Sequence, residues 1–315
     1  MNTLTPKIVV IGSAYVDMAI RCEKMLQPGK EVQGCGFSWT LTGPGPNQAA
    51  QAALCGCRAY LISKIGGDPF GRTIKEQLEQ LNVNTDYIFT AEARNTGIKV
   101  TVVDSEGENA SCRCTGANNA LRPEDIDSAE QVIADADICL IHGELPHETV
   151  EAAIKLAKLH GTKVILNPAR PLDNQILPID CFSDNILIPN LYEAAKITEH
   201  SAANFRAAKL IGSELVARGV ETAVITMGRR GCMIVDRNGA DQVEAFEIEL
   251  VDQTCTGDAF AGALAACLAA KDSIKNAVKF ASAAGALACT KFGSIESLPL
   301  KAEIIQLLQK GDFSD

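Results

Sequence analysis

Residues 252–260 read DQTCTGDAF and lie between an apolar run and an Ala-rich run. The pattern predicts a strand over 246–251, a helix over 258–271 and a helix-initiating turn at 254–257. The first backbone N–H groups of a helix have no partner within it, and the helix dipole is positive there. We therefore expect this turn to suit an anion, especially a phosphate.

Asp258 follows this turn, and two interpretations of its carboxylate are open. In one, it only complements the positive end of the helix dipole. In the other, it is a general base beside a phosphate site, where it accepts a hydroxyl proton while N–H groups stabilise a transferred phosphoryl group. Gly257 would let a ligand approach the backbone closely. The local sequence alone does not choose between the two.

Length and composition indicate a packed globular protein. The 315 residues are 47% hydrophobic and 22% charged, enough for two domains or one large α/β domain with an addition. The net charge of −10 predicts no general attraction to nucleic acid or to an anionic membrane. No run approaches about 18 apolar residues, and the amino-terminal segment resembles a first strand rather than a signal peptide. We therefore expect a cytoplasmic protein.

The 12 cysteines and four histidines raise two alternatives. They could form a structural zinc site, but no CxxC pair is present and the histidines are not at ligand spacing with cysteines. Reduced cysteines acting as small hydrophobic side chains are the favoured interpretation.

Short apolar runs alternate with helical patterns along most of the chain. Such runs suit strands buried on both faces, and the alternation predicts a doubly wound, mostly parallel α/β sheet with helices on both faces. The predicted strands are 7–12, 59–66, 138–143, 163–168, 185–190 and 222–228, and the predicted helices are 47–56, 70–81, 147–161, 204–219 and 258–271.

Two regions interrupt the alternation. Residues 14–42 contain β-like segments without a helix, and residues 95–116 predict a hairpin with its turn at 105–108. Together they predict a small β-sheet lid that covers an active site. The large nucleotide- and substrate-binding domain would then comprise residues 1–13, 43–94 and 117–309.

A Gly-rich patch, TGPGPNQAA at 42–50, also opens a predicted helix. It is either an ordinary loop or a place where the backbone and Asn47 approach a polyhydroxyl ligand. It does not match GxGxxG, and the chain has no GxxxxGK[ST] phosphate loop.

These motifs occur in an order that resembles the PfkB, or ribokinase-like, family of carbohydrate and nucleoside kinases. The resemblance covers nearly the whole chain and implies a ribokinase-like fold and ATP-dependent phosphoryl transfer. Its motifs are GSAYVD at 12–17, the patch at 43–47, GGDPFG at 66–71, Thr96-Gly97, GEN at 107–109, NPA at 167–169, PNLYEA at 189–194, TMGRRG at 226–231 and DQTCTGDAF at 252–260.

The resemblance implies roles for the catalytic residues. Asp258 matches the family's base, and Cys255, Thr256 and Gly257 match the anion hole for the transferred phosphoryl group. Asn190 and Glu193 match a pair that organises Mg²⁺.

It also implies a nucleotide site and a monovalent-cation site, with K⁺ as the expected ion. The predicted nucleotide-binding residues are Asn190, Thr226, Gly228, Arg229, Gly231, Gly257 and Ser282, although Arg229 and Arg230 could be ordinary surface arginines. The predicted cation site comprises Asp252, Thr254, Ala288, Lys291, Gly293 and Ser297.

For the acceptor, the resemblance implies sugar-hydroxyl contacts, although Asp17 could also be a strand-end charge and Glu144 a solvated loop charge. Ribokinases resemble GGKGxN at the Gly-rich patch and have Asn at the position of Tyr15, so Thr42, Pro44 and Tyr15 depart from that pattern. These departures leave the identity of the acceptor open. The predicted acceptor residues are Tyr15, Asp17, Gly43, Pro44, Asn47 and Glu144.

The expected function is an ATP-dependent kinase for a primary hydroxyl of a small sugar, a pentose or a hexose. A nucleoside kinase and a non-catalytic sugar-binding homologue are the alternatives. A phosphosugar kinase would need a basic acceptor pocket, for which Arg170 is a candidate. An exposed face or edge of the lid would need covering, so we expect a homodimer formed through the lid.

Overall fold

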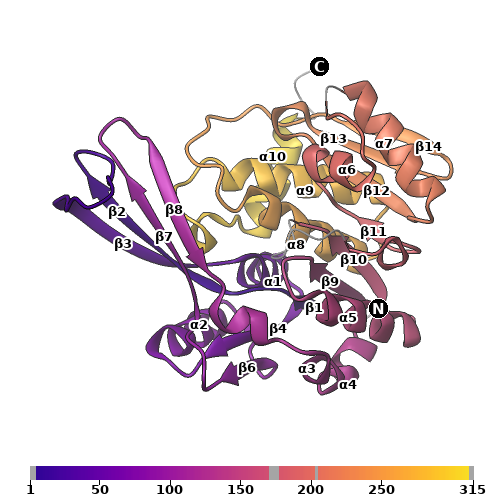
Figure 1. The fold of residues 1–315 in the computed structure, drawn as a ribbon. Helices are drawn as coiled ribbons and strands as arrows, with labels where there is room; N and C mark the ends of the chain where they lie inside the picture. The colour runs from indigo at the N-terminus through magenta and orange to yellow at the C-terminus, as the bar shows by residue number, and fades with distance from the viewer. Residues whose placement is uncertain (1–4, 170–176, 203–204, 312–315) are drawn as a thin grey trace.

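The computed structural model describes residues 5–169, 177–202 and 205–311. Within these ranges, ten strands form one large sheet in the order β14-β13-β12-β11-β10-β9-β1-β4-β5, and β6 pairs with β4 (Figure 1). All pairs are parallel except β12 with β13 and β13 with β14. Its strands are β1 Lys7–Ile11, β4 Arg58–Gly66, β5 Val83–Asn84, β6 Ile88–Ala91, β9 Ile138–His142, β10 Lys163–Asn167, β11 Ile186–Leu187, β12 Thr222–Thr226, β13 Cys232–Asp236 and β14 Gly239–Val243.

The alternating side chains of β1 show how the sheet builds two hydrophobic cores. Ile8 and Val10 belong to one buried cluster, and Val9 and Ile11 belong to the other. Successive residues of a strand point to opposite faces, so helices must cover both. One face packs against α1 Pro44–Leu54, α2 Pro69–Gln80, α8 Thr256–Ala269, α9 Ile274–Ala288 and α10 Lys301–Gly311, and the other against α3 Pro123–Asp127, α4 Glu130–Ala134, α5 His147–Leu159, α6 Leu191–Ile197 and α7 Phe205–Ala217. The predicted doubly wound architecture is confirmed.

Two strand predictions need correction. The segment 246–251 is not a strand, because the hydrogen bonds described for it run from the N–H groups of Val251 and Asp252 to the carbonyl of Cys289 at the end of α9 rather than to a neighbouring strand. The predicted strand 185–190 shortens to β11, followed by a single bridge between Asn190 and Thr226. Pro189 has no N–H group to continue the ladder.

The helices lie where the sequence predicted them, but several begin at a different residue. Helix α1 begins at Pro44 rather than at residue 47, because Gly43 at φ 112° turns the chain and proline is tolerated in a first helical turn. Helix α8 begins two residues before the predicted start, at Thr256. Helix α2 follows Asp68, whose side chain accepts a hydrogen bond from the Gly71 N–H at 2.9 Å.

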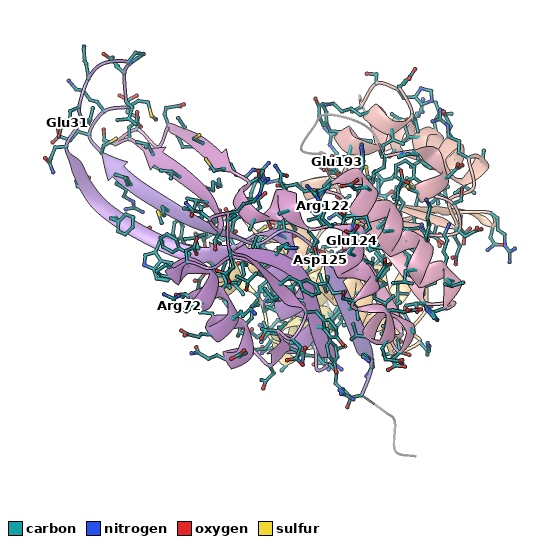
Figure 2. All side chains as sticks on the ribbon, turned by 60° about the horizontal axis from the view of Figure 1, so that its bottom comes forward. Glu31, Arg72, Arg122, Glu124, Asp125 and Glu193 are labelled. Carbon is teal, nitrogen blue, oxygen red and sulfur yellow. The ribbon has the colours of Figure 1, made fainter. Side chains whose placement is uncertain are left out.

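The four described strands outside the large sheet form a smaller sheet in the order β3-β2-β7-β8. These strands, β2 Tyr15–Cys22, β3 Gly34–Thr42, β7 Gly97–Val103 and β8 Asn109–Cys114, lie within the two segments predicted as the lid. The sheet extends as an arm from the large sheet, with Glu31 at its outer end (Figures 1 and 2). The turn between β7 and β8 is closed by Asp104, whose Oδ1 accepts the N–H groups of Glu106 and Glu108 at 3.0 Å.

The β13–β14 hairpin was not predicted, although its Asn238-Gly239 turn is a usable hairpin signal. Among the described residues, none of the helices is both long and apolar enough to cross a membrane.

Candidate active site

A cavity of about 240 Å³ lies where the small sheet meets the amino-terminal ends of α1 and α8. It brings together six residues predicted for catalysis or acceptor binding, and adds side chains from the lid strands β7 and β8. The lining residues are Tyr15, Thr42, Gly43, Pro44, Asn47, Lys99, Arg113, Thr254, Cys255 and Asp258.

Two amides of helix α1 hold the carboxylate of Asp258. Asn47 Nδ2 donates to Oδ2 at 2.9 Å, and Gln48 Nε2 donates to Oδ1 at 2.9 Å. Asn47 Oδ1 in turn accepts a hydrogen bond from Ser294 Oγ at 3.2 Å. Asn47, predicted as an acceptor ligand, therefore also contacts the predicted base, and Gln48 is a site residue that the sequence analysis missed.

Burial raises the pKa of the Asp258 carboxyl above its ordinary value, while the hydrogen bonds from Asn47 and Gln48 act to lower it. The net shift is upward. A carboxylate with a raised pKa binds a proton more readily than an exposed aspartate, which suits a group that must accept one.

The turn before Asp258 has an open surface at the start of α8, where the Thr256 N–H donates to the Gln253 carbonyl at 3.4 Å. Cys255 has a left-handed backbone, with φ 68° and ψ −3°, and forms the amino-terminal cap of α8. Burial raises the pKa of its thiol well above the usual value, so the sulfur stays protonated. Gly257 is exposed, and a Cβ added there would meet no protein atom within 4 Å. The space above this turn is therefore open to a ligand.

Glu144, predicted as an acceptor contact, lies in a network with Tyr15 and Arg113. Tyr15 donates its hydroxyl to Glu144 Oε1 at 2.8 Å, and Arg113 Nη1 lies 2.7 Å from the same oxygen. The guanidinium also lies over the Tyr15 ring, 5.4 Å from its centroid. Burial raises the pKa of Glu144, and Arg113 opposes that shift. This network joins lid strand β8 to the loop that follows β9.

His142 forms a hydrogen bond with the backbone of Glu144. Its Nδ1 accepts the backbone N–H of Glu144 at 3.3 Å. Burial lowers the pKa of His142 to about 3, so the ring is neutral.

Asp17 is paired within the lid itself. Lys99 Nζ lies 2.8 Å from Asp17 Oδ2, and Thr101 Oγ1 donates to Oδ1 at 3.3 Å. Neither Lys99 nor Arg113 was among the predicted site residues, although both lie in the predicted hairpin. They are directly paired across β7 and β8, and polar and apolar residues alternate along β7 from Lys99 to Val102. That alternation was the signal for a polar face toward the site.

We expect Arg113→Met to raise the KM for the acceptor about tenfold, because a charge-assisted hydrogen bond to a buried carboxylate is lost. The KM for ATP should change little. Steady-state kinetics on both substrates measure this. The control is Arg122→Met, which removes an exposed arginine (labelled in Figure 2) that is paired with Glu148 at 3.4 Å and does not line the cavity. Equal effects of the two substitutions on the acceptor KM would contradict the assignment of Arg113 to the acceptor site.

A second cavity, of about 270 Å³, gathers residues predicted for nucleotide binding. Asn190, Thr226 and Gly228 line it, together with Leu191, Tyr192, Met227 and Arg230. Arg230 rather than the predicted Arg229 is among the lining side chains.

Two further predicted nucleotide-binding residues, Gly231 and Ser282, lie in or next to the loop at 228–231 that follows β12. Gly228 and Gly231 both have positive φ, at 57° and 79°, and a Cβ at Gly231 would lie 2.0 Å from the Val243 carbonyl oxygen. Ser282, on α9, contacts Cys232 Sγ at 3.6 Å, next to this loop.

Asn190 and Glu193 form a capping box at the start of α6. Asn190 N donates to Glu193 Oε2 and Glu193 N donates to Asn190 Oδ1, each at 2.9 Å. Burial raises the pKa of Glu193. In the described part of the chain no three or more His, Cys, Asp or Glu side chains cluster as a metal cage. This single carboxylate fits Mg²⁺, which usually keeps several waters and binds phosphates.

Some of the residues predicted for the cation site lie close together, and others have different partners. Asp252 accepts the N–H of Thr254 at 2.9 Å and that of Gly293 at 3.2 Å. Burial raises the pKa of Asp252, but these hydrogen bonds prevail and lower it below its usual value. Lys291 instead pairs with Glu303 at 3.2 Å. Ser297 donates to the carbonyl of Ser294 at 2.7 Å, and Ala288 directly precedes Cys289, whose carbonyl accepts the Asp252 N–H.

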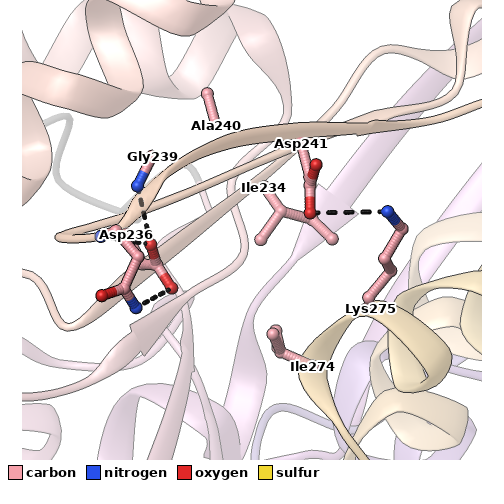
Figure 3. A pocket seen from close by; sticks show the side chains of 8 residues that line it. Ile234, Asp236, Gly239, Ala240, Asp241, Ile274 and Lys275 are labelled. Atoms are coloured by element: carbon pink, nitrogen blue, oxygen red, sulfur yellow. Dashed lines mark hydrogen bonds and ion pairs between the residues drawn. The ribbon is translucent and has the colours of Figure 1, made fainter.

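A further cavity, of about 330 Å³, lies between the β13–β14 hairpin and the start of α9 (Figure 3). Its polar groups are engaged with one another: Asp236 accepts the N–H groups of Asn238 and Gly239, and Asp241 lies 3.5 Å from Lys275. It contains none of the predicted site residues. Arg170, the candidate for a basic pocket, lies outside the described residues.

This fold and site, with a carboxylate beside an open helix amino terminus, define a small-molecule kinase of the ribokinase-like class. The model of the pfkB family of carbohydrate kinases matches residues 5–301. Ribokinase from Haemophilus influenzae is 32% identical over 303 residues, covering 96% of this chain and 98% of that protein. Deoxyribokinase from Salmonella typhi is 30% identical over 292 residues, covering 93% and 95%.

The structure of Arabidopsis thaliana ribokinase complexed with ribose and ATP matches with a TM-score of 0.91 and 27% identity, covering 97% of this chain and 99% of that one. The chain therefore belongs to the pfkB family of carbohydrate kinases, and it is an ATP-dependent carbohydrate kinase. The resemblance and the fold class proposed from sequence are both confirmed.

Proposed function

We propose that this kinase transfers the γ-phosphoryl group of ATP to a primary hydroxyl of a small neutral sugar, with Asp258 as the general base. The observation that carries the proposal is the 240 Å³ cavity in which Asp258, the first turn of α8 and the lid side chains meet. Its partners would be ATP and a free sugar.

The charges around this cavity favour a neutral acceptor. Lys99 is paired with Asp17, and Arg113 is paired with Glu144, so each lid cation already has a counter-ion. Asp258 adds a further carboxylate. A phosphosugar would bring more negative charge to a site without an unpaired cation among the described lining residues, so we favour a free sugar.

The proposed mechanism is positioning combined with electrostatics. The acceptor hydroxyl lies against Asp258, which accepts its proton as the oxygen attacks the γ-phosphorus. The bond between that phosphorus and the bridging oxygen breaks at the same time, and ADP leaves. The N–H groups of residues 255–257 stabilise the charge on the transferred group, and the lid excludes water. Mg²⁺, near Asn190 and Glu193, would neutralise phosphate charge. K⁺, near Asp252 and Thr254, would support the loop at 289–297 that packs beside α8.

The related proteins leave the sugar open, because one is a ribokinase and another a deoxyribokinase. Tyr15 is one of the positions, with Thr42 and Pro44, at which this chain departs from the ribokinase pattern, and its hydroxyl donates a hydrogen bond to Glu144. Ribose and deoxyribose are therefore the first candidates, before hexoses and nucleosides.

The experiment is a coupled assay of ADP release with pentoses, hexoses, nucleosides and phosphosugars, run with Mg²⁺ and K⁺ and with each ion omitted. We expect one neutral sugar to dominate in kcat/KM and turnover to need Mg²⁺. A dominant phosphosugar would overturn the neutral-acceptor proposal. Sugar binding in a thermal-shift assay without turnover of any acceptor would favour the non-catalytic alternative.

We also propose that the chain forms a homodimer through the lid. Strand register places only apolar side chains on the lid face that points away from the acceptor cavity, and Phe37 and Trp39 there are 64% and 44% exposed. An exposed apolar face of this kind suits a second copy of the same surface. The face consists of Met18, Ile20, Phe37, Trp39, Val100, Val102, Ala110 and Cys112.

We expect Phe37→Asp to weaken dimerisation by on the order of 100-fold or more, because a charge would be buried at the interface. Size-exclusion chromatography with light scattering should give twice the chain mass for the wild type and the single-chain mass for the variant. Leu159→Asp, at a leucine that ends α5 and is 75% exposed, is the control and should stay dimeric. A monomeric wild type would contradict the proposal.

A further inference from the structure

We propose that Gln48 is a positioning residue for phosphoryl transfer: with Asn47, it fixes the orientation of the Asp258 carboxylate toward the acceptor hydroxyl. The proposal rests on the function proposed above, in which Asp258 is the base. It assigns a role to a side chain that lies beneath the cavity rather than in it.

Two amide hydrogen bonds fix the geometry of the Asp258 carboxylate. Each carboxylate oxygen of Asp258 accepts one amide N–H, from Asn47 on one side and from Gln48 on the other, both at 2.9 Å. Two donors on two different oxygens fix both the position and the rotation of a carboxylate, whereas a single donor leaves the rotation free. Each oxygen keeps a lone pair for the acceptor proton.

The packing of α1 against α8 leaves the Gln48 side chain little conformational freedom. Gln48 is fully buried. Gly262, one turn beyond Asp258 on α8, lets α1 approach closely: a Cβ there would lie 2.5 Å from the Gln48 carbonyl oxygen and 2.7 Å from Gln51 Cβ. The two helices are therefore pressed together at the level where the amide meets the carboxylate.

The electrostatics agree with this geometry. The hydrogen bond from Gln48 acts to lower the pKa of Asp258 against the effect of burial, and so favours the ionised form of the base. The other charged or titratable groups facing Asp258 are Lys99, Arg113, Glu144, Tyr15 and Cys255. All of them remain when Gln48 is replaced, so the contribution of its amide can be measured separately.

The test is Gln48→Met, which keeps the length of the side chain and removes the donor. We expect kcat to fall roughly tenfold to a hundredfold, the size of a lost hydrogen bond to a charged group, with the acceptor KM little changed. The base must be ionised to act, so activity is lost as pH falls through its pKa. Without the donor that pKa rises, and the acidic limb of the pH profile should move to higher pH.

Gln51→Met is the matched control. Gln51 is also fully buried on α1, and its Nε2 donates to the Pro299 carbonyl at 3.0 Å rather than to the base. It should cost similar thermal stability but leave kcat and the pH profile unchanged. Equal kinetic losses in both variants would overturn the proposal, as would wild-type kinetics in Gln48→Met.

Gln48→Glu is the second variant, because it keeps the shape of the side chain if Gln48→Met does not fold. Two facing carboxylates raise the pKa of the pair, so the acidic limb should again move to higher pH. An unmoved limb would overturn the proposal. Wild-type kinetics in Gln48 variants would leave Asp258 as the base, whereas a fully active Asp258→Asn variant would remove the proposed base itself.

Discussion

Asp258→Asn should lose most turnover, with kcat reduced on the order of 10²- to 10⁴-fold, because the group that accepts the hydroxyl proton is gone. ATP binding should persist, since the cavity lined by Asn190, Thr226 and Gly228 is built from other elements. Steady-state kinetics with the preferred sugar, together with nucleotide binding by calorimetry, measure both effects.

The variant should also fold, which makes its kinetics interpretable. An asparagine amide at position 258 would face the amide donors of Asn47 and Gln48. Gln48 Oε1 has no hydrogen-bond partner in the described structure, so the Gln48 amide can turn over and accept from the new NH₂ group. The thermal midpoint should therefore stay close to that of the wild type. Near-full activity in this variant would remove Asp258 from the mechanism.

The part of the fold that was predictable from sequence depends on patterns within one segment. The run KIVVIG at 7–12 is apolar throughout, and it became β1 with a core on each face. The segment 246–251 has an equally plausible strand pattern, yet it pairs with no strand. Whether an extended segment joins a sheet depends on a partner elsewhere in the chain, which the local pattern does not contain.

Site residues that depend on contacts between distant segments were also not predictable from local sequence patterns. The order of motifs singled out Asp258, Asn47, Gly43 and Tyr15, and these four residues line one cavity. Gln48 was missed because its role requires α1 to pack against α8, about 210 residues away in sequence, and that contact depends on Gly262. Lys99 and Arg113 were missed because a lid residue belongs to the site only once the lid lies over it. Both errors concern contacts between distant segments.

Gly257→Ala should separate catalysis from stability. Its φ is not in the left-handed region, and an added Cβ meets no protein atom within 4 Å, so the folded chain accepts the methyl group. Alanine is preferred over glycine in a helix by about 1 kcal/mol, and the thermal midpoint should rise slightly. Turnover should nevertheless fall roughly a hundredfold, because the methyl group would lie in the open space where the transferred phosphoryl group meets the N–H groups.

Gly262→Ala, on the same helix, supplies the contrast for this prediction. Its Cβ would lie 2.5 Å from the Gln48 carbonyl oxygen, so this variant should lose stability and activity together. Only a ligand above the turn explains a methyl group that stabilises the protein and stops the reaction. If Gly257→Ala keeps the wild-type kcat, the first turn of α8 does not hold the transferred group, and the phosphoryl site must lie elsewhere along the cavity.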